Sequence, residues 1–584
     1  MKLQKSFIDV IKNHTDIFFF FLSILIIIAF KFVQFPSLTY HAEVFAESGT
    51  NYFANAYSKS FFQNIFLTDA GYLTLVQRII AVTVVKYFGA VSAYPYFTQA
   101  FAVIFIAAVS SLPNLNFFKQ HINSKLFRFI LGISIGLISD YELNAFINFM
   151  YYGIVVLFFL FFVNLEKQSR KKIICLIIIS ALIILSKGQY IAIMPAYILF
   201  LIYHIFKKNW NSTIYYLSVV VASLVQFVVL ISNSQSTGHN FFYFPFYFVK
   251  TAYYLLLTYR HVFFGYVEKE NVNLLVFGVL FFMFLFAFLR AVIRGKNKAI
   301  YPLLLANLIA FCSLFLNVAL SYSTNVQIQK MTSSATSTKS ISQSVKAVTG
   351  TVIEESRNDK GLFEVKHFAN LRSNFFSNVL IFMTGIILLL YLFPKRNDQF
   401  LLLIFLIYTS GAFGQIKVEE AYPAKSLSYS QWGTYSKLLT NRQYCIPLNN
   451  YPDLLGKNCD VLVFKNQDDL IPSEPPGREI DVSKFSKSYV HWSITAVVLI
   501  TKTLRYSDSA KFELYAYDDK NMPLGVAKQL VPSDYDFVYY LFDRPVKSAA
   551  TLVWKNEKGK AINVPQSVVL LGTSSEKTFQ KIKY

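Results

Sequence analysis

Charged side chains are scarce in this sequence. Asp, Glu, Lys and Arg make up only 15% of the 584 residues, whereas hydrophobic residues make up 54%. Soluble globular proteins carry about a quarter charged residues. The composition therefore excludes a simple soluble enzyme and a disordered chain, and it predicts a polytopic membrane protein.

Acidic residues are scarcer than basic ones, with 33 Asp and Glu against 55 Lys and Arg and a formal net charge of +22. Such a balance is also found in proteins that bind nucleic acid. Here, however, the basic residues lie in short clusters between apolar runs, which is how the orientation of a membrane protein is encoded. We therefore predict no nucleic-acid partner.

Sequence motifs of soluble enzymes are missing as well. The chain has no Walker loop, no Rossmann glycine pattern, no nucleophile elbow and no zinc-ligand spacing. The first absence argues against an ATP-driven transporter. Four cysteines are too few for a disulfide framework.

Long apolar runs, in contrast, are abundant. About 20 residues are needed to cross ~30 Å of hydrocarbon as a helix. Eleven runs qualify, within one or two because several are short: 17–33, 95–113, 126–140, 146–164, 173–186, 190–206, 213–232, 272–293, 300–320, 374–393 and 399–416. No small-residue cleavage site directly follows the first run, so we predict a retained helix with a cytoplasmic N-terminus.

The loop charges agree with this arrangement. With eleven helices, the basic clusters all fall on the side of the N-terminus: 119–128, 166–172, 207–208, 294–298 and 395–396. The positive-inside rule makes that side cytoplasmic. An odd number of helices then places the C-terminus outside, in a multi-pass protein of the cytoplasmic (inner) membrane.

Three predicted outer segments are long, at 36–94, 233–271 and 321–372. Within the first, the interrupted amphipathic stretches 61–66 and 71–89 predict helices that lie on the outer leaflet. The third opens with a Ser/Thr-rich run, 321–351, whose composition cannot form a core. A lid that orders on substrate binding and a plain spacer both fit that run.

The composition changes at about residue 417. Apolar runs shorten to strand length at 460–465, 490–501, 511–517, 537–542, 550–554 and 567–571, and turn-forming residues separate them at 507–509, 518–521 and 556–559. This spacing is typical of an antiparallel β-sandwich, which we place on the outer face over residues 417–584. Cys445 and Cys459 lie in this segment, where an oxidising compartment permits a disulfide between them.

Four acidic residues of the outer loops are candidates for acid–base chemistry. Glu43 and Glu47 are four apart, so a helix would place both carboxylates on one face. Asp140 and Glu142 fall between two apolar runs. A carboxylate beside apolar walls at the membrane surface has a raised pKa, which suits a general base. The alternative is that these residues only solvate loops.

Further candidates are polar residues at predicted helix ends. Asn144 and Asn148 either face a cavity or bridge helices, and Asp69 either caps the helix after Gly71 or binds substrate. Cations on the predicted outer side could bind the phosphate of a lipid carrier. The alternative is that they lie at the protein surface or extend toward the membrane surface without a ligand. The cations are Lys187, in the polar break Ser186-Lys-Gly-Gln189, Arg260 beside His261, and Arg372.

This arrangement of helices and outer segments resembles the GT-C superfamily of integral-membrane glycosyltransferases, which use polyprenyl-phosphate sugars. The resemblance covers residues 1–416 and the start of the C-terminal part. The stretches similar to bacterial members are Glu43 with 69–73 and Arg78, the break 186–189 with Pro195, and Trp432 with 446–449.

The resemblance implies an inverting transfer from a polyprenyl-phosphate donor to a cell-envelope glycan or lipid-linked acceptor. Glu43 or Glu47 would deprotonate the acceptor hydroxyl, and Lys187, Arg260 and Arg372 would stabilise the leaving phosphate. Asp140 or Glu142 would bind acceptor, sugar or metal, with a divalent cation optional. The same resemblance gives the expected substrate-binding residues: Asp69, Tyr72, Arg78, Asn144 and Gln189.

Other functions remain open at this point. A polysaccharide polymerase or ligase would depend on outer arginines, namely Arg260, Arg357 and Arg372. A lipid or glycan transporter would show internal repeats and broken helices in mid-membrane. A structural membrane protein with an outer binding domain is the remaining reading.

Overall fold

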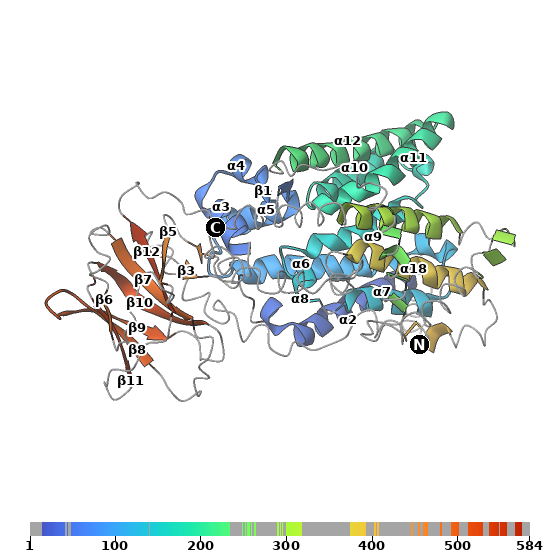
Figure 1. The fold of residues 1–584 in the computed structure, drawn as a ribbon. Coiled ribbons are helices and arrows are strands. Elements are labelled where there is room, and N and C mark those ends of the chain that lie inside the picture. The colour runs from blue at the N-terminus through green and yellow to red at the C-terminus, as the bar shows by residue number, and fades with distance from the viewer. Residues whose placement is uncertain are drawn as a thin grey trace, which may run out of the picture. The chain divides into compact units, whose positions relative to one another are not determined.

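The structure is a computed structural model (Figure 1). It describes residues 15–233 apart from 41, 43, 45–47, 70 and 139, and residues 300–317 and 374–392. It also describes short pieces between 248 and 295, residues 402–404 and 406–407, and the C-terminal pieces 446–447, 454–455, 459–464, 479–481, 492–500, 512–529, 537–547, 549, 551–556 and 567–574.

The chain divides into two compact units. Unit 1 comprises Met1–Phe35, Ile65–Ile79 and Ala100–Val418, and unit 2 comprises Pro36–Asn64, Ile80–Gln99 and Glu419–Tyr584. The sequence-based boundary between 416 and 417 concerned composition alone and stays a prediction.

The first half of the chain is helical. The α-helices in order are α2 (Thr15–Gln34), α3 (Ala54–Ser58), α4 (Phe61–Ile65), α5 (Leu75–Val82), α6 (Tyr94–Ser110), α7 (Lys125–Gly136), α8 (Tyr141–Asn144), α9 (Gly153–Leu160), α10 (Arg170–Ile184), α11 (Met194–Phe206) and α12 (Trp210–Asn233), with α18 (Phe375–Leu392) further on. Short 3-10 or π turns join several of them: η2 (Ser48–Phe53), η3 (Thr83–Tyr87), η5 (Asn116–Gln120), η6 (Phe149–Tyr152) and η8 (Gly188–Ile193).

Five helical segments in the described part of the chain are long and apolar enough to cross a membrane. They are Asp16–Gln34, Tyr94–Asn114, Gly188–Phe206, Trp210–Asn233 and Ile300–Asn317, and Phe149–Leu160 and Phe375–Tyr391 are shorter apolar helices. A multi-pass membrane protein is therefore supported. The predicted count of eleven is not confirmed, and the run 272–293 lies mostly outside the described residues.

Two predicted spans are shorter than the apolar runs. The run 126–140 forms a helix only to Gly136, and the run 146–164 becomes α-helical at Gly153 and ends at Leu160. The reason is the polar stretch between them, because Asp140 and Asn144 bind backbone groups at this turn and interrupt the helix.

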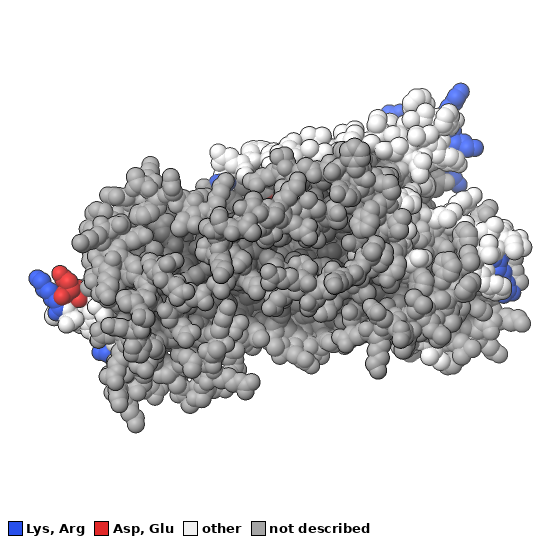
Figure 2. All heavy atoms as spheres, viewed as in Figure 1, with Lys and Arg blue, Asp and Glu red and all other residues white. Residues whose placement is uncertain are grey.

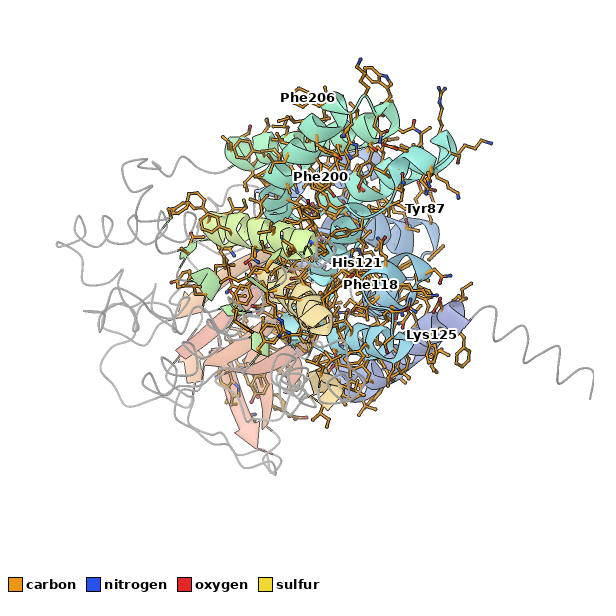
Figure 3. The ribbon with its side chains drawn as sticks, turned by 90° about the vertical axis from the view of Figure 1, so that its right-hand side faces the viewer. Tyr87, Phe118, His121, Lys125, Phe200 and Phe206 are labelled. Carbon is orange, nitrogen blue, oxygen red and sulfur yellow. The ribbon has the colours of Figure 1, made fainter. Side chains whose placement is uncertain are left out.

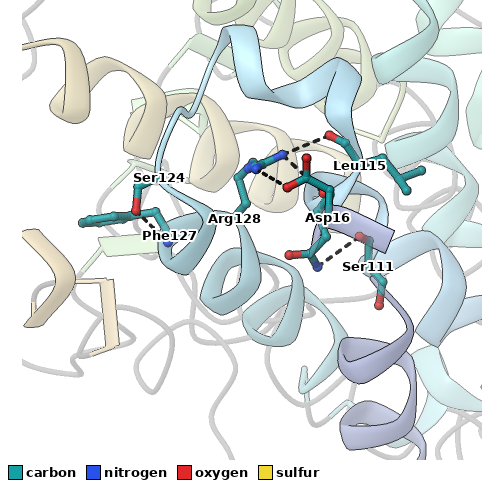
Figure 4. Close-up of polar contacts among 7 residues, drawn as sticks. Asp16, Ser111, Leu115, Ser124, Phe127 and Arg128 are labelled. Atoms are coloured by element: carbon teal, nitrogen blue, oxygen red, sulfur yellow. Dashed lines mark hydrogen bonds and ion pairs between the residues drawn. The ribbon is translucent and has the colours of Figure 1, made fainter. Parts of the chain in front are cut away.

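In unit 1, α2 and α7 lie side by side and run in the same direction (Figure 4). At their first turns, Arg128 Nη2 donates to Asp16 Oδ1 at 2.8 Å. At the other end of α2, Lys31 Nζ donates to the carbonyl of Ile138, just after α7, at 2.9 Å. Because α2 and α7 run in the same direction, the chain must return between them, and α6 is the long helix of that connection.

The Arg128 side chain is 1% exposed and that of Asp16 is 12% exposed. Arg128 also donates to the carbonyls of Asn114 and Leu115, both at 3.2 Å. Arg128 is therefore a structural cation of the interior, where the sequence predicted a basic loop residue. Removing one partner of such a pair costs about 3–5 kcal/mol, since a buried charge is left behind.

A second group of helices in unit 1 is α10, α11 and α12, with α12 packed against both others. Tyrosine and phenylalanine rings fill the space between them: the Phe161 ring stacks on that of Tyr197 at 4.6 Å between centroids, and Tyr215 and Tyr216 are buried nearby. Phe206, at the end of α11, is exposed (Figure 3).

Basic side chains gather at one end of these helices (Figure 2). Exposed lysines lie at the start of α10 and after α11, at Lys171, Lys172, Lys207 and Lys208. At another helix end, Phe118 and His121 of the α6–α7 connection lie together with ring centroids 5.6 Å apart (Figure 3). The basic clusters 166–172 and 207–208 thus share an end, as the loop charges predicted, but the side of the membrane is not shown.

The chain between α2 and α6, which contributes residues to both units, forms short helices with many aromatic side chains. The predicted surface helix 61–66 corresponds to α4, whereas 71–89 is divided into the end of a hairpin, α5 and η3. Exposed rings include Phe62, Phe66, Tyr87 and Phe88. The predicted interruption of 71–89 is therefore observed, because Gly71 turns the chain with a φ of +84° before α5 begins. That these helices lie on the membrane surface stays a prediction.

The C-terminal part of unit 2 contains an antiparallel sheet. In the described residues it has eight strands in the order β5-β12-β7-β10-β9-β8-β11-β6. Their bounds are β5 (Cys459–Phe464), β6 (Glu479–Asp481), β7 (Trp492–Ile500), β8 (Phe512–Tyr517), β9 (Pro523–Gln529), β10 (Phe537–Lys547), β11 (Thr551–Asn556) and β12 (Ser567–Ser574). Two-residue strands β3 (Ile446–Pro447) and β4 (Leu454–Leu455) pair separately.

All six predicted strand runs overlap observed strands, and β6 and β9 were not predicted. The described residues form one continuous sheet, so the second sheet of a sandwich is not confirmed. One face is well packed: Leu514, Ala516, Leu552 and Trp554 are fully buried. The predicted turn 518–521 is confirmed, since Asp518 Oδ1 accepts from the backbone N–H of Lys520 and of Met522.

Candidate functional site

The 138–152 segment of unit 1 carries four of the predicted polar residues: Asp140, Glu142, Asn144 and Asn148. It leaves α7, forms α8, and ends in η6. Asp140 is the N-cap of α8, and its Oδ1 accepts from the N–H of Leu143 at 2.8 Å. Asn144 Nδ2 donates to the carbonyls of Ile138 (3.0 Å) and Asp140 (2.6 Å). These bonds fix the turn, because they satisfy a backbone N–H of the one-turn helix and two carbonyls that precede it.

Lys187 approaches the other end of this segment. It follows the C-cap of α10 in extended backbone conformation and is 6% exposed. Its Nζ donates to Asn148 Oδ1 at 2.7 Å. The same ammonium lies 4.6 Å from the ring centroid of Tyr151 and 5.4 Å from that of Tyr72. An amide oxygen and two aromatic faces thus stabilise a buried positive charge.

The first turn of α5 is joined to the same place. The N–H of Leu75 donates to the carbonyl of Leu185 at 3.1 Å, and the N–H of Val76 donates to Ser186 Oγ at 3.0 Å. First-turn amides have no acceptor within their own helix. The break after α10 therefore caps α5, which fixes the position of Lys187 relative to both helices.

Gln77 adds a third polar side chain beside Lys187. Its Nε2 lies 3.5 Å from the carbonyl of Ile147 and 3.4 Å from that of Ser186, the neighbours of Asn148 and Lys187. Gln77 Oε1 and Asn148 Nδ2 are buried and have no hydrogen-bond partner among the described residues. Buried polar atoms normally have one. A polar ligand here would meet an acceptor, a donor and an ammonium.

Lys31 of α2 is a second buried cation, and it binds the 138–152 segment. It is 1% exposed, and its Nζ donates to Gln34 Oε1 and to the carbonyl of Ile138, each at 2.9 Å. The carboxylate of Asp140 acts electrostatically on Lys31 and on the buried Tyr152 phenol. Asp140 is therefore both a helix cap and the nearby negative charge for Lys31.

The predicted stretch 68–78 folds into a hairpin followed by a helix. Strands β1 (Thr68–Asp69) and β2 (Tyr72–Leu73) pair antiparallel around Gly71. The prediction that Asp69 caps the next helix is wrong, because Asp69 pairs with Tyr72 and α5 begins only at Leu75. The hairpin brings the Tyr72 ring to Lys187 and to Gly188, where a Cβ would lie 3.0 Å from that ring.

Two other predicted residues are linked to the framework. Arg78 is 1% exposed, and its Nη2 donates to the carbonyl of Thr68 at 3.2 Å, which ties α5 to β1. Gln189 Nε2 donates to Ser313 Oγ at 3.1 Å, which ties η8 to the span Ile300–Asn317. Glu142 lies half-buried in α8.

Several predicted residues lie outside the described residues: Glu43, Glu47, Arg260, Arg357, Arg372 and Cys445. The predicted base and two predicted phosphate-binding cations therefore stay predictions. The disulfide is also untested, since only Cys459, at the start of β5, is placed. Within the described part of the chain, no group of three or more His, Cys, Asp or Glu residues could hold a metal ion.

The structure brings Lys187 together with Tyr72 and Asn148, which the sequence had singled out. It adds Gln77, Tyr151 and Lys31, which the sequence did not assign. Gln77, Asn148 and Tyr151 surround the ammonium, and Lys31 binds the start of the same segment. Lys31 had a signal in the sequence, because a lysine inside an apolar run is rare unless it has an interior partner. Gln77 had none beyond its polarity.

Comparisons with known proteins do not assign the chain to a family. None of the family models, curated proteins or solved structures compared with it matches. Functional arguments therefore rest on the residues of this chain.

Proposed function

We propose that the protein is a membrane glycosyltransferase. It moves a sugar from a polyprenyl-phosphate donor to a cell-envelope glycan or lipid-linked acceptor at the outer face of the membrane. The observation that carries the proposal is the buried Lys187 ammonium, held by Asn148 Oδ1 at 2.7 Å beside the Tyr72 and Tyr151 rings. Burying a charged side chain in a membrane protein costs free energy, so such residues commonly mark functional positions.

The proposed role of Lys187 is to stabilise the leaving group. In the transfer, the acceptor oxygen attacks the anomeric carbon, the bond from that carbon to the phosphate oxygen breaks, and its electron pair stays on the lipid phosphate. A fixed ammonium in a low-dielectric site favours this growing negative charge far more than it would in water. The orphan donor Asn148 Nδ2 can bind the same phosphate, whereas the orphan acceptor Gln77 Oε1 suits a sugar hydroxyl.

The proton of the acceptor hydroxyl goes to a carboxylate. By the GT-C resemblance this base is Glu43 or Glu47. Asp140 fits the role of base less well than the sequence implied, because its Oδ1 caps α8 and its charge acts on Lys31. We assign Asp140 to positioning the 138–152 segment.

The test is transfer of radiolabelled sugar from a panel of polyprenyl-phosphate donors by the purified full chain. We expect Lys187→Met to lower turnover about a hundredfold, which is typical for the loss of one group that stabilises developing charge. Lys171→Met removes an exposed ammonium at the far end of α10 and should match wild type. Equal turnover of both variants would disprove the assigned role of Lys187.

A transporter remains a second candidate because two observations favour it. Lys31 and Lys187 are buried cations, and the α10–α11 connection is a polar break between apolar helices. Both features occur in substrate pathways of transporters. Proteoliposomes containing the chain separate the functions: movement of a fluorescent lipid-linked sugar between leaflets, without formation of a new glycosidic bond, would favour transport.

A further inference from the structure

The outward face of strands β8 and β11 carries a cluster of four side chains, here called the tyrosine pair site: Glu513, Tyr515, Tyr517 and Lys555. The first three alternate along β8 and so share one face, and Lys555 of β11 stands directly opposite Glu513. The residues between them, Leu514 and Ala516, are fully buried on the other face.

The two rings of the site are nearly parallel, with centroids 6.4 Å apart and planes at 20°. Tyr515 OH donates to Glu513 Oε2 at 2.7 Å, and Lys555 Nζ donates to Tyr517 OH at 2.6 Å. The ammonium also contacts both ring faces, at 4.6 Å from Tyr515 and 5.1 Å from Tyr517. Each ring is therefore fixed by its own polar partner, although both are only half-buried.

The strand that carries the rings is internal to the sheet. β8 pairs with β9 on one side and with β11 on the other, so backbone pairing holds it at both edges. Aromatic rings that are already ordered lose little side-chain freedom when a ligand stacks on them. Two ordered tyrosine rings on the outward face are thus suited to binding a ligand. Rings that served only to pack the sheet would lie on its buried face.

We propose that the tyrosine pair site binds a neutral oligosaccharide. The C–H faces of pyranose rings stack on tyrosine rings, while sugar hydroxyls donate to the Glu513 carboxylate and accept from the Lys555 ammonium. Charges of both signs meet at this register, because Lys555 of β11 and Lys528 of β9 both lie opposite Glu513. A strongly acidic or basic peptide would meet a like charge, which favours a hydroxyl-rich, uncharged ligand.

The inference rests on the proposed function only for the source of its ligand, which would be the growing glycan acceptor. The binding chemistry belongs to the sheet and does not depend on the residues around Lys187. Binding at the sheet would keep a polymeric acceptor near the enzyme between transfers and so raise its effective concentration.

The experiment is retention of the full chain, purified in detergent, on a panel of immobilised neutral hexose and pentose oligosaccharides. We expect Tyr515→Ala and Tyr517→Ala each to lower affinity roughly three- to tenfold. Tyr517→Phe keeps the ring and should retain most of the affinity. Lys555→Ala removes the ammonium that contacts both rings and should also lower affinity. Lys520→Ala is its matched control, because Lys520 is exposed in the neighbouring turn, where its backbone N–H donates to Asp518.

Two results would overturn the inference: no retention of wild type on any saccharide of the panel, or equal retention of wild type and both alanine variants. Thermal unfolding of each variant in the same detergent checks that the sheet is intact. The transfer assay on Lys187→Met separates the two proposals. Retention without transfer by the wild-type chain refutes the glycosyltransferase, whereas transfer without retention refutes the saccharide site.

Discussion

Two lysines show how single residues are accommodated in the apolar interior of this protein. Lys31 and Lys187 each donate to an oxygen of the 138–152 segment, at Ile138 and Asn148. The desolvation of an ammonium is costly, and such hydrogen bonds offset part of that cost. Two separate elements, α2 and the break after α10, are thereby joined to one short segment.

At the same scale, Tyr515 gives a prediction about pH. The hydrogen bond to Glu513 raises the pKa of the Tyr515 phenol above its usual value, because the protonated phenol is the donor. A raised pKa in the folded state means that this contribution to stability is present below the ordinary phenol pKa, near ~10, and is lost as pH rises through the raised value.

We expect Glu513→Gln to bring the Tyr515 titration back toward its usual pKa, measured by ¹³C-tyrosine NMR of the full chain, with Tyr515→Phe to assign the signal. An unchanged Tyr515 titration in Glu513→Gln would show that the hydrogen bond does not control it.

At the scale of elements, α8 depends on its N-cap. We expect Asp140→Ala to destabilise the protein by about 1 kcal/mol, since it removes the acceptor for the Leu143 N–H. Asp140→Asn keeps an acceptor and removes the charge. Thermal unfolding should therefore show a larger loss for alanine than for asparagine, because both variants lose the negative charge near Lys31 and only alanine also loses the cap.

The transfer assay on the same two variants then separates capping from catalysis. If Asp140 only positions the segment, Asp140→Asn retains most of its turnover. A large loss in Asp140→Asn with unchanged stability would instead return Asp140 to the catalytic role that the sequence predicted.

The elements also show what sequence could and could not predict. Apolar runs gave α2, α12 and most strands within a few residues, because length and periodicity determine them locally. β9 was missed because Pro523-Leu-Gly-Val-Ala-Lys-Gln529 has no clear alternation, and its pairing with β8 and β10 holds it in the sheet. Likewise, Asp69 was predicted to be a cap because Gly71 was expected to turn the chain into a helix, whereas Gly71 turns it into a hairpin in which Asp69 pairs with Tyr72.

For the candidate site, the sequence indicated which residues are candidates for function, but not which of them contact one another. Lys187 stood out as an outer-side cation in a polar break. Its partner Asn148 is 39 residues away, and Gln77 reaches the same place from α5. Such contacts depend on how helices pack, which one sequence does not reveal.

At the scale of the whole molecule, membrane orientation remains a prediction that can be measured. We expect Ser92→Cys, in a cysteine-free background, to react with an impermeant maleimide on intact cells. Lys208→Cys should react only after permeabilisation, because the basic loops are retained in the cytoplasm. Both positions are exposed. Reversed labelling would invert the predicted topology.

The two ends of α2 have a consequence for synthesis of the protein. Asp16 and Lys31 find their partners 112 and 107 residues later in the chain. α2 therefore leaves the ribosome with a charge near each end, and although Gln34 is already present for Lys31, neither distant partner has yet been made. Until α7 emerges beside it, α2 is an incomplete element, so its settling in the bilayer must wait for a later segment of the same chain.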